Sequence, residues 1–504
     1  MSPRACAASV RWPTGGPDSA WAQALGESLL AASQEEPKRL PRTLPCTVLT
    51  QLVTAAGQLF AAEETLVEAR RDIACSCAAR ELALTLPPQL SPPVGCKVTV
   101  VGDTHGQLHD VVRLLEVTGP PGPDSWLVFN GDLVDRGAWG CEVLALVLAW
   151  KVALPGCVTV LRGNHESAFC TQAYGFAREL HAKYTPTAAQ GLYARLLKLF
   201  AQLPLGCRVG RHTFVCHGGL YRRPQQQAAK RAAGRARALM VGAPEVHAPL
   251  PLSCLGSLAE LRHAYRGGKD PDGEGDSRLA SDVTWSDPQP TPGLLFNEAR
   301  GIGLVFGPDA TAAFLEANGL RLVIRSHEGP DARDKRPEMG SMQDGWCVDH
   351  QTPHGCLATL FSAPCYPQFV AEGEAQPDNR AAVAVLRGPT WAEPQVLRFH
   401  AAPRPRATPY YDLDQPGSDE EGPAPHEEPP VHQAAGGVMP LEAPRGTESP
   451  AGEAAEPTPA PSPSPSPGQA PEEPAQPEEM VVGEAAEQAS LPAAEDSLRL
   501  DSRT

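Results

Sequence analysis

Short apolar runs recur along the middle of the chain, and each ends in a polar cluster. The runs are Lys97–Val101, Trp126–Phe129, Val158–Leu161, Thr213–Cys216 and Leu322–Ile324. β-Branched and aromatic residues in a short run bounded by polar or glycine residues predict a buried strand. Two apolar stretches between the first three runs, Leu108–Val117 and Cys141–Val152, predict helices. Strands that alternate with helices predict parallel pairing and an α/β fold.

Further runs extend this pattern in both directions. Leu357–Phe361 and Ala381–Leu386 predict two more strands, which we expect to be antiparallel and to extend a second sheet. Upstream, Val48–Arg71 carries Leu, Val and Phe at helical spacing. This spacing predicts a helix that packs on the core; a helix that binds a partner is the alternative.

Composition and charge divide the chain into three parts. Residues 1–95 form an N-terminal extension, which we expect to be partly helical, and residues 96–402 form a domain that contains the strand-like runs. Residues 403–504 are rich in Pro, Ala, Glu and Ser, which predicts a disordered acidic tail. The net charge is −16, and residues 401–504 hold 20 acidic and 5 basic side chains. The rest is therefore nearly neutral, which argues against nucleic-acid binding.

Cysteine usage and hydropathy indicate a location inside the cell. Fourteen cysteines are scattered without a Cys-x-x-Cys pair, as is typical of reduced thiols. No apolar run approaches the roughly 20 residues that cross a bilayer, so we expect no membrane association. The nucleus and the cytoplasm are the expected locations. Arg4 and Arg11, with no acidic residue before Asp18, make an organelle transit peptide a minor alternative.

Six polar clusters follow apolar runs, and together they are rich in Asp, His, Asn and Arg. They are Gly102–Gln107, Gly131–Gly137, Gly163–Glu166, His217–Gly219, Arg300–Gly301 and Arg325–Glu328. Side chains beyond the carboxyl ends of parallel strands gather at one edge of a sheet. Carboxylate, amide and imidazole groups are ligands of divalent metal ions. One cluster alone would be an ordinary polar turn, but the six together predict metal and phosphate chemistry.

The spacing of the clusters assigns ligands to two metal ions. Asp103 and His105 lie two residues apart at one strand end and would hold the first ion, with Asp132 as the bridging carboxylate. The second ion would be held by three side chains from later strand ends: Asn164, His217 and His327. Two such ions, roughly 3.5–4 Å apart, produce a hydroxide nucleophile near neutral pH. We expect two divalent ions, with manganese, iron and zinc as candidates.

Other cluster residues are suited to bind and cleave a phosphate ester. His165 could protonate the leaving group, and Asp135, in a glycine-bounded turn, could orient the imidazole of His165. Arg136 and Arg300 offer planar guanidinium groups to phosphoryl oxygens. These residues predict hydrolysis of a phosphate ester, with His165 as the general acid.

The motifs resemble those of the metal-dependent serine/threonine phosphoprotein phosphatases. The matching segments are GDTHGQ (102–107), GDLVDRG (131–137), LRGNHE (161–166), HGG (217–219), WSDP (285–288), FGPDATAAFL (306–315), RSHE (325–328) and FSAPCY (361–366). The resemblance runs from about Lys97 to Gly388. It implies a metallophosphoesterase α/β fold, with two mixed β-sheets as a central sandwich flanked by helices. It also implies the ligand and acid assignments given above, and it adds Tyr174 and Tyr366 at the substrate rim.

Three segments, 131–140, 297–309 and 326–340, resemble the plant protein phosphatase seven subgroup more than the abundant catalytic subunits. The rim sequence departs from the family. It reads Cys365-Tyr366-Pro367, where the family commonly has Asn, Tyr and Cys. We therefore expect a rim loop of different shape.

A second departure is a variable basic insert, residues 222–281, within the catalytic domain. It begins with six basic side chains and continues with Leu239, Met240 and Val241. Basic residues followed by apolar ones are typical of calmodulin targets, and the resemblance to the plant subgroup implies the same partner for Arg222–Val241. A nuclear-import patch and a solvated face are the alternatives.

The sequence therefore predicts a protein serine/threonine phosphatase that acts on phosphoprotein substrates. One alternative is a metallophosphoesterase that acts on phosphotyrosine or nucleotides. The other is a phosphatase-like scaffold, against which the intact set of metal-ligand candidates argues. No nucleic-acid or membrane partner is expected.

Overall fold

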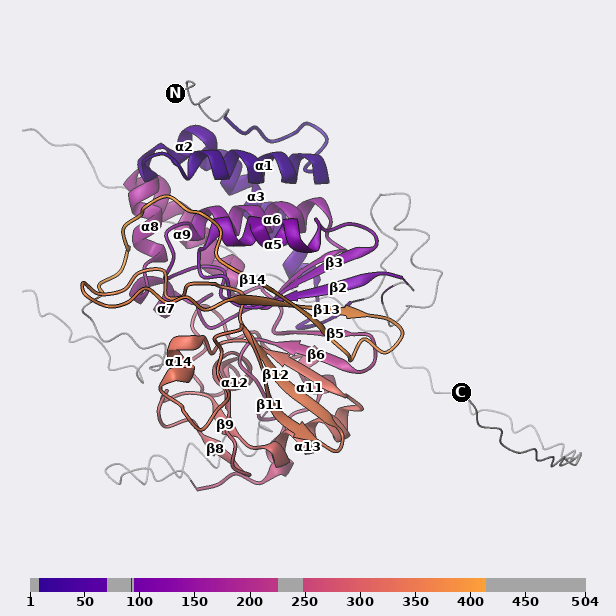
Figure 1. Ribbon diagram of the computed structural model, residues 1–504. Helices are drawn as coiled ribbons and strands as arrows, with labels where there is room; N and C mark the ends of the chain where they lie inside the picture. Colours follow the sequence, from indigo (N-terminus) through magenta and orange to yellow (C-terminus); the bar gives the residue numbers. More distant parts are fainter. Residues whose placement is uncertain (1–8, 70–91, 93–94, 225–247, 414–504) are drawn as a thin grey trace, which may run out of the picture. The chain divides into compact units, whose positions relative to one another are not determined.

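The computed structural model describes residues 9–69, 92, 95–224 and 248–413. All of these residues belong to one compact unit, residues 1–430. They form two mixed β-sheets, a small third sheet and helices that cover the two larger sheets (Figure 1).

The predicted strands are present, with bounds that differ by a residue or two. The first sheet has the order β14-β13-β2-β3-β4, the second β1-β5-β6-β10-β12-β11, and the small sheet β7-β9-β8. The bounds are β1 (Leu66–Ala69), β2 (Lys97–Val101), β3 (Ser125–Phe129), β4 (Val158–Val160), β5 (Gly206–Val209), β6 (Thr213–Cys216), β7 (Asp287–Pro288), β8 (Leu294–Phe296), β9 (Leu304–Phe306), β10 (Leu322–Arg325), β11 (Trp346–Thr352), β12 (Gly355–Leu360), β13 (Ala381–Arg387) and β14 (Gln395–Phe399).

Strand pairing agrees with the prediction for the early strands and differs for two later ones. β2, β3 and β4 are parallel, as strand–helix alternation predicts. The sequence predicts an antiparallel β12, but β12 is parallel to β10 and antiparallel only to β11. β13 is antiparallel as predicted, but it pairs with β2 and so extends the first sheet instead of the second. A short apolar run identifies a strand but not its neighbour.

The two large sheets pack face to face, because alternate side chains of a strand point to opposite faces. Val98 and Val100 of β2 and Trp126 of β3 share one buried cluster with Val215 of β6 and Ile324 of β10. The alternate residues of β3, Leu127 and Phe129, face the other way. They belong to the core that the first sheet forms with the helices. This arrangement is the predicted central sandwich.

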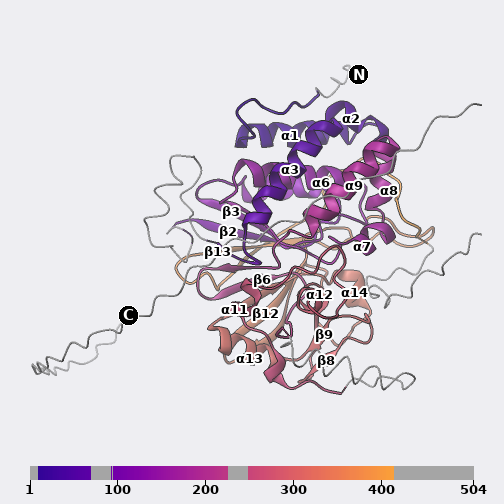
Figure 2. The ribbon, with the colours of Figure 1, turned by 180° about the vertical axis from the view of Figure 1, so that it is seen from behind.

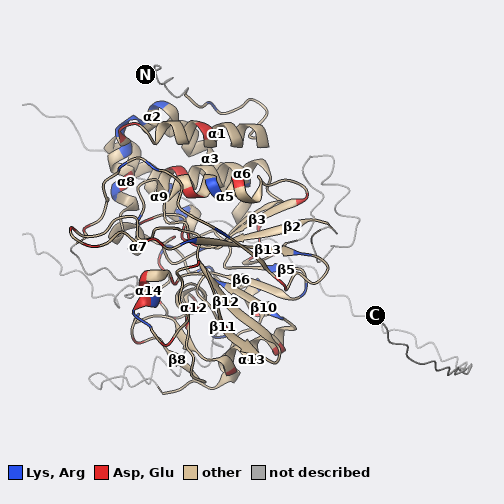
Figure 3. Ribbon diagram, in the orientation of Figure 1, with Lys and Arg blue, Asp and Glu red and all other residues tan. Residues whose placement is uncertain are grey.

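Helices cover the outer face of each large sheet (Figures 1 and 2). α1, α3, α5, α6, α8 and α9 share an apolar core with the first sheet, and α11, α12 and α13 share another with the second. The bounds are α1 (Ser19–Ala32), α2 (Leu40–Thr43), α3 (Cys46–Ala62), α5 (Leu108–Thr118), α6 (Gly140–Ala153), α7 (Ala168–Ala173), α8 (Phe176–Lys183), α9 (Pro186–Phe200), α11 (Leu258–Arg262), α12 (Arg278–Trp285), α13 (Pro308–Asn318) and α14 (Pro330–Asp334), with short 3-10 turns at Pro37–Arg39 and Leu252–Cys254. Charged residues of both signs lie along the helices, and the strands carry few (Figure 3).

The N-terminal extension packs on the core instead of standing apart. α3 lies against α6 and α9 with Leu49, Leu52 and Phe60 buried. The predicted helix Val48–Arg71 is too long, because the backbone becomes extended at Glu63 (ψ 150°) and Leu66–Ala69 forms β1 beside β5. In the part of the chain that the structure describes, no single helix could span a membrane; Pro37–Thr43 and Cys46–Ala62 together meet the length and composition test only as a sharply bent pair.

The predicted insert and the start of the predicted tail both pack on the domain where they are described. In the predicted insert 222–281, Leu261 of α11 and Leu279 of α12 are buried in the second core, and residues 225–247 lie outside the described residues. The tail is predicted to begin at residue 403, but the structure describes the chain to residue 413, and Tyr410 packs on the first helical core. Residues 414–504 lie outside the described part.

A buried ionic network closes the N-terminus of α6. The Glu179 carboxylate accepts hydrogen bonds from the backbone N–H groups of Gly140 (3.1 Å) and Cys141 (2.7 Å). The Lys183 ammonium group lies 2.5 Å from Glu142 and 2.7 Å from Glu179 and donates to Ala138 O at 2.9 Å. The first N–H groups of a buried helix need such acceptors, and the lysine offsets the two carboxylates.

We expect Lys183→Met to lower the free energy of unfolding by about 3–5 kcal/mol, because it leaves two buried carboxylates without their cation. Urea denaturation followed by circular dichroism measures the loss. Lys38→Met is the matched control, since the Lys38 side chain is 75% exposed in its ion pair with Glu36 and should change stability by no more than about 0.5 kcal/mol. Similar small effects of the two substitutions would contradict a structural role for the network.

Candidate metal and phosphate site

The carboxyl ends of strands from both large sheets meet at one place. Beyond β2 and β12, Asp103 and Phe361 form an isolated parallel bridge that joins the two sheets. The Gly102 N–H donates to Ser362 Oγ at 2.8 Å. A Cβ at Gly102 would lie 2.4 Å from the Leu360 carbonyl oxygen, so only glycine permits this approach. The polar clusters of the two sheets are therefore held against each other.

Asn130 connects the two sheets in the middle of the site. Its side-chain amide donates to the Cys216 carbonyl at the end of β6 (2.7 Å) and to Ser326 Oγ directly after β10 (2.9 Å). Its own carbonyl oxygen accepts from His217 Nδ1 at 2.8 Å. Sequence reasoning did not single out Asn130; its place between the β3 run and Gly131-Asp132 was the available signal.

Two groups of buried donor side chains share Asp132. One is His105, Asp132 and His165, and the other is Asp132, His217 and His327; the candidate ligand atoms within each group lie within 4.8 Å of one another. Asp132 Oδ2 is 3.3 Å from His217 Nε2 and 3.7 Å from His105 Nε2. A carboxylate between imidazoles from both sheets is the geometry expected of a bridging ligand.

Backbone carbonyl groups orient the imidazole rings. His105 Nδ1 lies 3.1 Å from the Val134 carbonyl, and His217 Nδ1 lies 2.8 Å from that of Asn130. When Nδ1–H donates to a carbonyl oxygen, Nε2 is left to bind a metal ion. Asn164 Oδ1 is 2.9 Å from His217 Nε2, which brings the predicted amide ligand to the second group. Asp103 lies beside this group, with its carboxylate 3.1 Å from the His327 N–H and 3.8 Å from His217 Nδ1.

The electrostatics of these side chains suit bound cations. Burial, together with the charge of Asp132, raises the pKa of Asp103 to about 7, although His217 opposes the shift. Burial and the neighbouring Arg300 hold the pKa of His327 well below its usual range, so its imidazole is neutral. The buried His327 Nε2 has no hydrogen-bond partner among the described residues. A neutral imidazole and crowded carboxylates are the donor set of a divalent metal site, so these residues suit the predicted ions.

The loops that carry these side chains are strained. Positive φ angles occur at His105 (38°), Asp132 (50°), Asp135 (68°), Arg136 (62°) and His327 (72°). Non-glycine residues rarely adopt this conformation, which costs about 1–3 kcal/mol at each position and is concentrated at functional sites. The fold therefore holds these residues in place against their local preference.

Glu166 stabilises the strained turn at Asp132. Its carboxylate accepts from the N–H groups of Asp132 (2.9 Å), Leu133 (2.9 Å) and Gly163 (2.8 Å). The Arg162 guanidinium in turn donates to the Glu166 carbonyl at 2.9 and 3.1 Å. Glu166 therefore joins the turn after β3 to the turn after β4.

The predicted acid and its partner are in hydrogen-bond contact. His165 Nδ1 lies 2.8 Å from Asp135 Oδ2, and Asp135 Oδ1 accepts from the Phe176 N–H at 2.9 Å. The His165 backbone N–H donates to Asp132 Oδ1 at 3.0 Å. The imidazole of His165 is thus fixed by Asp135 and lies in the same group as Asp132 and His105.

The two predicted phosphate-binding arginines are held in different ways. Arg136 donates its N–H to the Tyr174 carbonyl (3.1 Å), and its guanidinium carbon lies 4.2 Å from the centre of the Tyr174 ring. The Tyr174 ring is also 5.1 Å from that of His165. Arg300 instead forms an ion pair with Asp287, with 2.5 Å between Nε and Oδ2.

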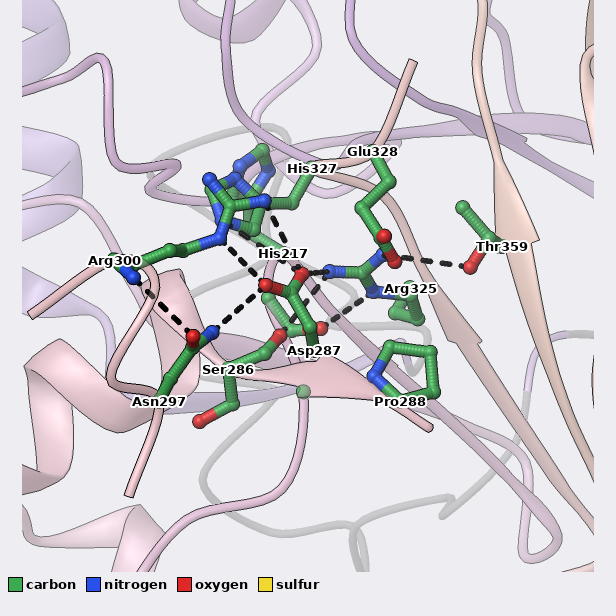
Figure 4. Close-up of polar contacts among 12 residues, drawn as sticks. His217, Ser286, Asp287, Pro288, Asn297, Arg300, Arg325, His327, Glu328 and Thr359 are labelled. Atoms are coloured by element: carbon green, nitrogen blue, oxygen red, sulfur yellow. Dashed lines mark hydrogen bonds and ion pairs between the residues drawn. The ribbon is translucent and has the colours of Figure 1, made fainter. Parts of the chain in front are cut away.

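Asp287 stands between two buried arginines (Figure 4). Besides Arg300, it accepts from Arg325 Nη2 at 3.0 Å, and Arg325 Nη1 donates to Glu328 at 2.7 Å. Burial alone would raise the pKa of Asp287, but Arg300 and Arg325 lower it to about 2. In the sequence, Asp287 stands out only as part of the matching WSDP segment, and nothing there identifies it as the anchor of Arg300.

The rim loop brings Tyr366 into the site as a packed side chain. Its ring is stacked on the His105 imidazole, with centres 5.0 Å apart, and Tyr366 is only 2% exposed. Asn379 holds this loop through the N–H groups of Cys365 and Tyr366. All twelve predicted site residues are at most 9% exposed.

Comparisons with known proteins show which family this chain resembles. Residues 96–331 match the family described as calcineurin-like phosphoesterase. The chain is 41% identical over 408 residues to serine/threonine-protein phosphatase 7 of Arabidopsis thaliana, across 80% of this chain and 92% of that protein. It is 34% identical to human serine/threonine-protein phosphatase 5, across 62% of this chain and 50% of that protein.

A solved structure of a Saccharomyces cerevisiae protein serine/threonine phosphatase, described as similar to human phosphatase PP5, has a similar fold. The TM-score is 0.53 at 27% identity, and the match covers 74% of this chain and 95% of that one. Sequence and fold comparisons therefore indicate the same group of proteins.

We expect Mn²⁺ to raise the thermal unfolding midpoint, because an ion that binds only the folded state stabilises it by about 2.7 kcal/mol at 100 times its Kd. Asp132→Asn should remove most of this rise, since both donor groups include that carboxylate. Calorimetry measures the thermal unfolding midpoint of the wild type and of Asp132→Asn, each in chelator and in Mn²⁺. Glu116→Gln is the control, as Glu116 lies on the exposed side of α5 beside Arg113. An equal rise in all three proteins would exclude Asp132 as a ligand.

Proposed function

The chain belongs to the serine/threonine-protein phosphatase family of calcineurin-like phosphoesterases, and from this membership we propose that it hydrolyses phosphoserine and phosphothreonine in proteins. The observation that carries the proposal is the Asp132 carboxylate, which belongs to both groups of candidate metal ligands. His165 lies beside it, and Arg136 and Arg300 lie next to these two groups. Metal ligands, a proton donor and two guanidinium groups are the parts needed to hydrolyse a phosphate monoester.

Two divalent ions, with manganese, iron and zinc as the candidates, would be held by Asp103, His105, Asp132, Asn164, His217 and His327, and when bound they would make water nucleophilic near neutral pH. The imidazole and carboxylate donors accord with any of the three metals. The pairing of His105 with Asp132 and of His217 with Asn164 supports this ligand set.

His165 supplies the proton to the leaving oxygen. Its Nδ1 contacts Asp135 at 2.8 Å, so Nε2 carries the proton that is transferred. A negative carboxylate at this distance favours the imidazolium form and fixes the ring plane. Asp135 acts through His165 and does not itself touch the substrate.

Arg136 and Arg300 bind the phosphoryl oxygens. A guanidinium presents two parallel N–H groups to two oxygens of a phosphate. Arg300 keeps its position through Asp287, and Arg136 through the Tyr174 ring. Both groups are at least nine-tenths buried, and charge–charge stabilisation of the transition state is stronger away from bulk water. Tyr174 and Tyr366 form the apolar side of this site.

The proposed substrates are phosphoproteins, and the proposed location is the nucleus or the cytoplasm. The relatives named above are serine/threonine-protein phosphatases, and this chain carries the residues that match their motifs from 102 to 366. A panel of phosphoserine, phosphothreonine and phosphotyrosine peptides, with a dinucleoside polyphosphate, tests the substrate class. Preference for the last two would refute the proposal, and no hydrolysis by the metal-loaded protein would favour the scaffold.

We further propose that the basic part of the insert binds calmodulin. The support is the sequence of Arg222–Val241, which lies outside the described residues from residue 225 onwards. Arg222 itself is paired with Asp282, with 2.6 Å between Nη2 and Oδ1, so the exposed part of a target helix would follow it. The remaining basic residues and Leu239 to Val241 supply charge and apolar contacts.

We expect His165→Asn to lower kcat by about 100- to 10,000-fold, because general acid catalysis contributes a factor of that size. The Ki of inorganic phosphate should change by much less, since the arginines remain. Steady-state kinetics on a phosphothreonine peptide at saturating Mn²⁺ separates the two quantities. His181→Asn on the exposed face of α8 is the matched control. A parallel loss of turnover and of phosphate binding would rule out the acid role.

A peptide of residues 222–245 should bind calmodulin only in the presence of Ca²⁺. Native gel shift and calorimetry, with a second peptide in which Leu239 and Met240 are replaced by Glu, report the interaction. The altered peptide keeps the six basic residues but loses the apolar anchors, so it should not bind. Binding of neither peptide would leave the basic segment without this partner, and equal binding of both would show that Leu239 and Met240 are not the anchors.

A further inference from the structure

The chain beyond the last strand runs back to the candidate site. We call residues 400–413 the C-terminal strap; it follows β14 and is the last described part of the chain. The buried Asp110 of α5 accepts from the Ala402 N–H (2.7 Å) and from Arg404 Nη1 (3.0 Å). These two hydrogen bonds attach the start of the strap to the domain, and the second involves Arg404, which composition assigned to the tail.

The other end of the strap lies against the loop between α7 and α8, where the orange end of the ribbon passes α8 (Figure 1). A Cβ at Gly175 would lie 3.3 Å from Tyr410 Cβ and 3.4 Å from Tyr411 Cδ1. The Tyr410 ring packs on the helical core near Lys183, and burial raises its pKa to about 12. Gly175 has φ +116°, so a side chain there would be both strained and crowded.

Tyr411 thereby reaches Arg136. The centre of its ring lies 5.2 Å from the Arg136 guanidinium carbon, in addition to the Tyr174 ring at 4.2 Å. The same loop is bound to the catalytic turn by the Arg136 N–H to Tyr174 O contact and by the Phe176 N–H to Asp135 contact. Two aromatic rings from distant parts of the sequence therefore contact one phosphate-binding guanidinium.

We propose that Tyr411 is a positioning residue of the phosphate site, which acts by holding the Arg136 guanidinium together with Tyr174. This inference rests on the proposed function. An aromatic face attracts a guanidinium through the partial negative charge of the ring, so the Tyr174 and Tyr411 rings both restrain the plane of the Arg136 guanidinium. Arg300 is held by the carboxylate of Asp287, which uses Nε and Nη2. Asp287 thus supplies a carboxylate to Arg300, whereas Tyr174 and Tyr411 supply aromatic contacts to Arg136, one of them from the strap.

The test compares three variants of the full-length protein. Tyr411→Leu removes the π-face and keeps apolar volume, Tyr411→Phe keeps the ring, and Tyr410→Leu removes the neighbouring ring that lies near Lys183 instead of Arg136. Steady-state kinetics on a phosphothreonine peptide, inhibition by inorganic phosphate and the thermal midpoint are measured for each. Tyr411→Leu should raise both KM and the phosphate Ki by roughly 2- to 30-fold, the strength of one cation–π contact, with kcat changed less than about twofold.

The controls distinguish positioning from packing. Tyr411→Phe should match the wild type in KM and Ki, and Tyr410→Leu should lower the thermal midpoint while leaving the phosphate Ki unchanged. A lower kcat at unchanged Ki, or a gain of activity in Tyr411→Leu, would overturn the inference; the gain would mean that the strap obstructs the site. If the wild type does not hydrolyse the phosphopeptide, the proposed function fails, whereas equal KM and Ki in an active wild type and Tyr411→Leu refute only the role of Tyr411.

Discussion

The buried carboxylate of Asp132 is the contact on which the arrangement of this site depends. It accepts the N–H of His165 from the loop after β4 and faces His217 from the second sheet and His105 from the first. A buried carboxylate is costly unless cations or hydrogen bonds surround it. His217, His165 and His105 together lower its pKa despite its burial, and Glu166 fixes the turn below it. Because the partners of Asp132 come from both sheets, the packing of the sandwich and the assembly of the site are one event.

A second set of buried charges supports the opposite side. Arg300, Asp287, Arg325 and Glu328 alternate in sign through successive ion pairs, and Arg333 continues the series from Glu328. Buried ion pairs contribute little net stability, because desolvation offsets the attraction. They do fix geometry, since each planar guanidinium has defined directions for its hydrogen bonds. Non-glycine residues at positive φ in the same loops, such as Asp132 and His327, add local strain. The precision of the site is therefore obtained at the expense of stability.

Both ends of the described chain are tied to this domain. The N-terminal extension supplies α1 and α3 to the helical core and β1 to the second sheet. The C-terminal strap is fixed at Asp110 and reaches the aromatic contacts of Arg136. Segments that look peripheral by composition therefore contribute packing and, at Tyr411, an aromatic neighbour of Arg136. Polar or proline-rich composition lowers the apolar area that a segment can bury, but a few well-placed contacts with an existing surface are enough to order it.

The sequence by itself determined the strands, the order of the polar clusters and the residues with metal and phosphate chemistry, because strand periodicity and side-chain chemistry are local properties. His165 with Asp135, and Asp132 with His217, could be expected from their motifs alone. The tertiary structure decided the neighbours: that β13 joins the first sheet, that Asn130 links the two sheets, that Asp287 holds Arg300, and that Tyr411 meets Arg136. These contacts join residues that are far apart in the chain or unremarkable where they stand, and only the mutual packing of the sheets and loops brings them within reach.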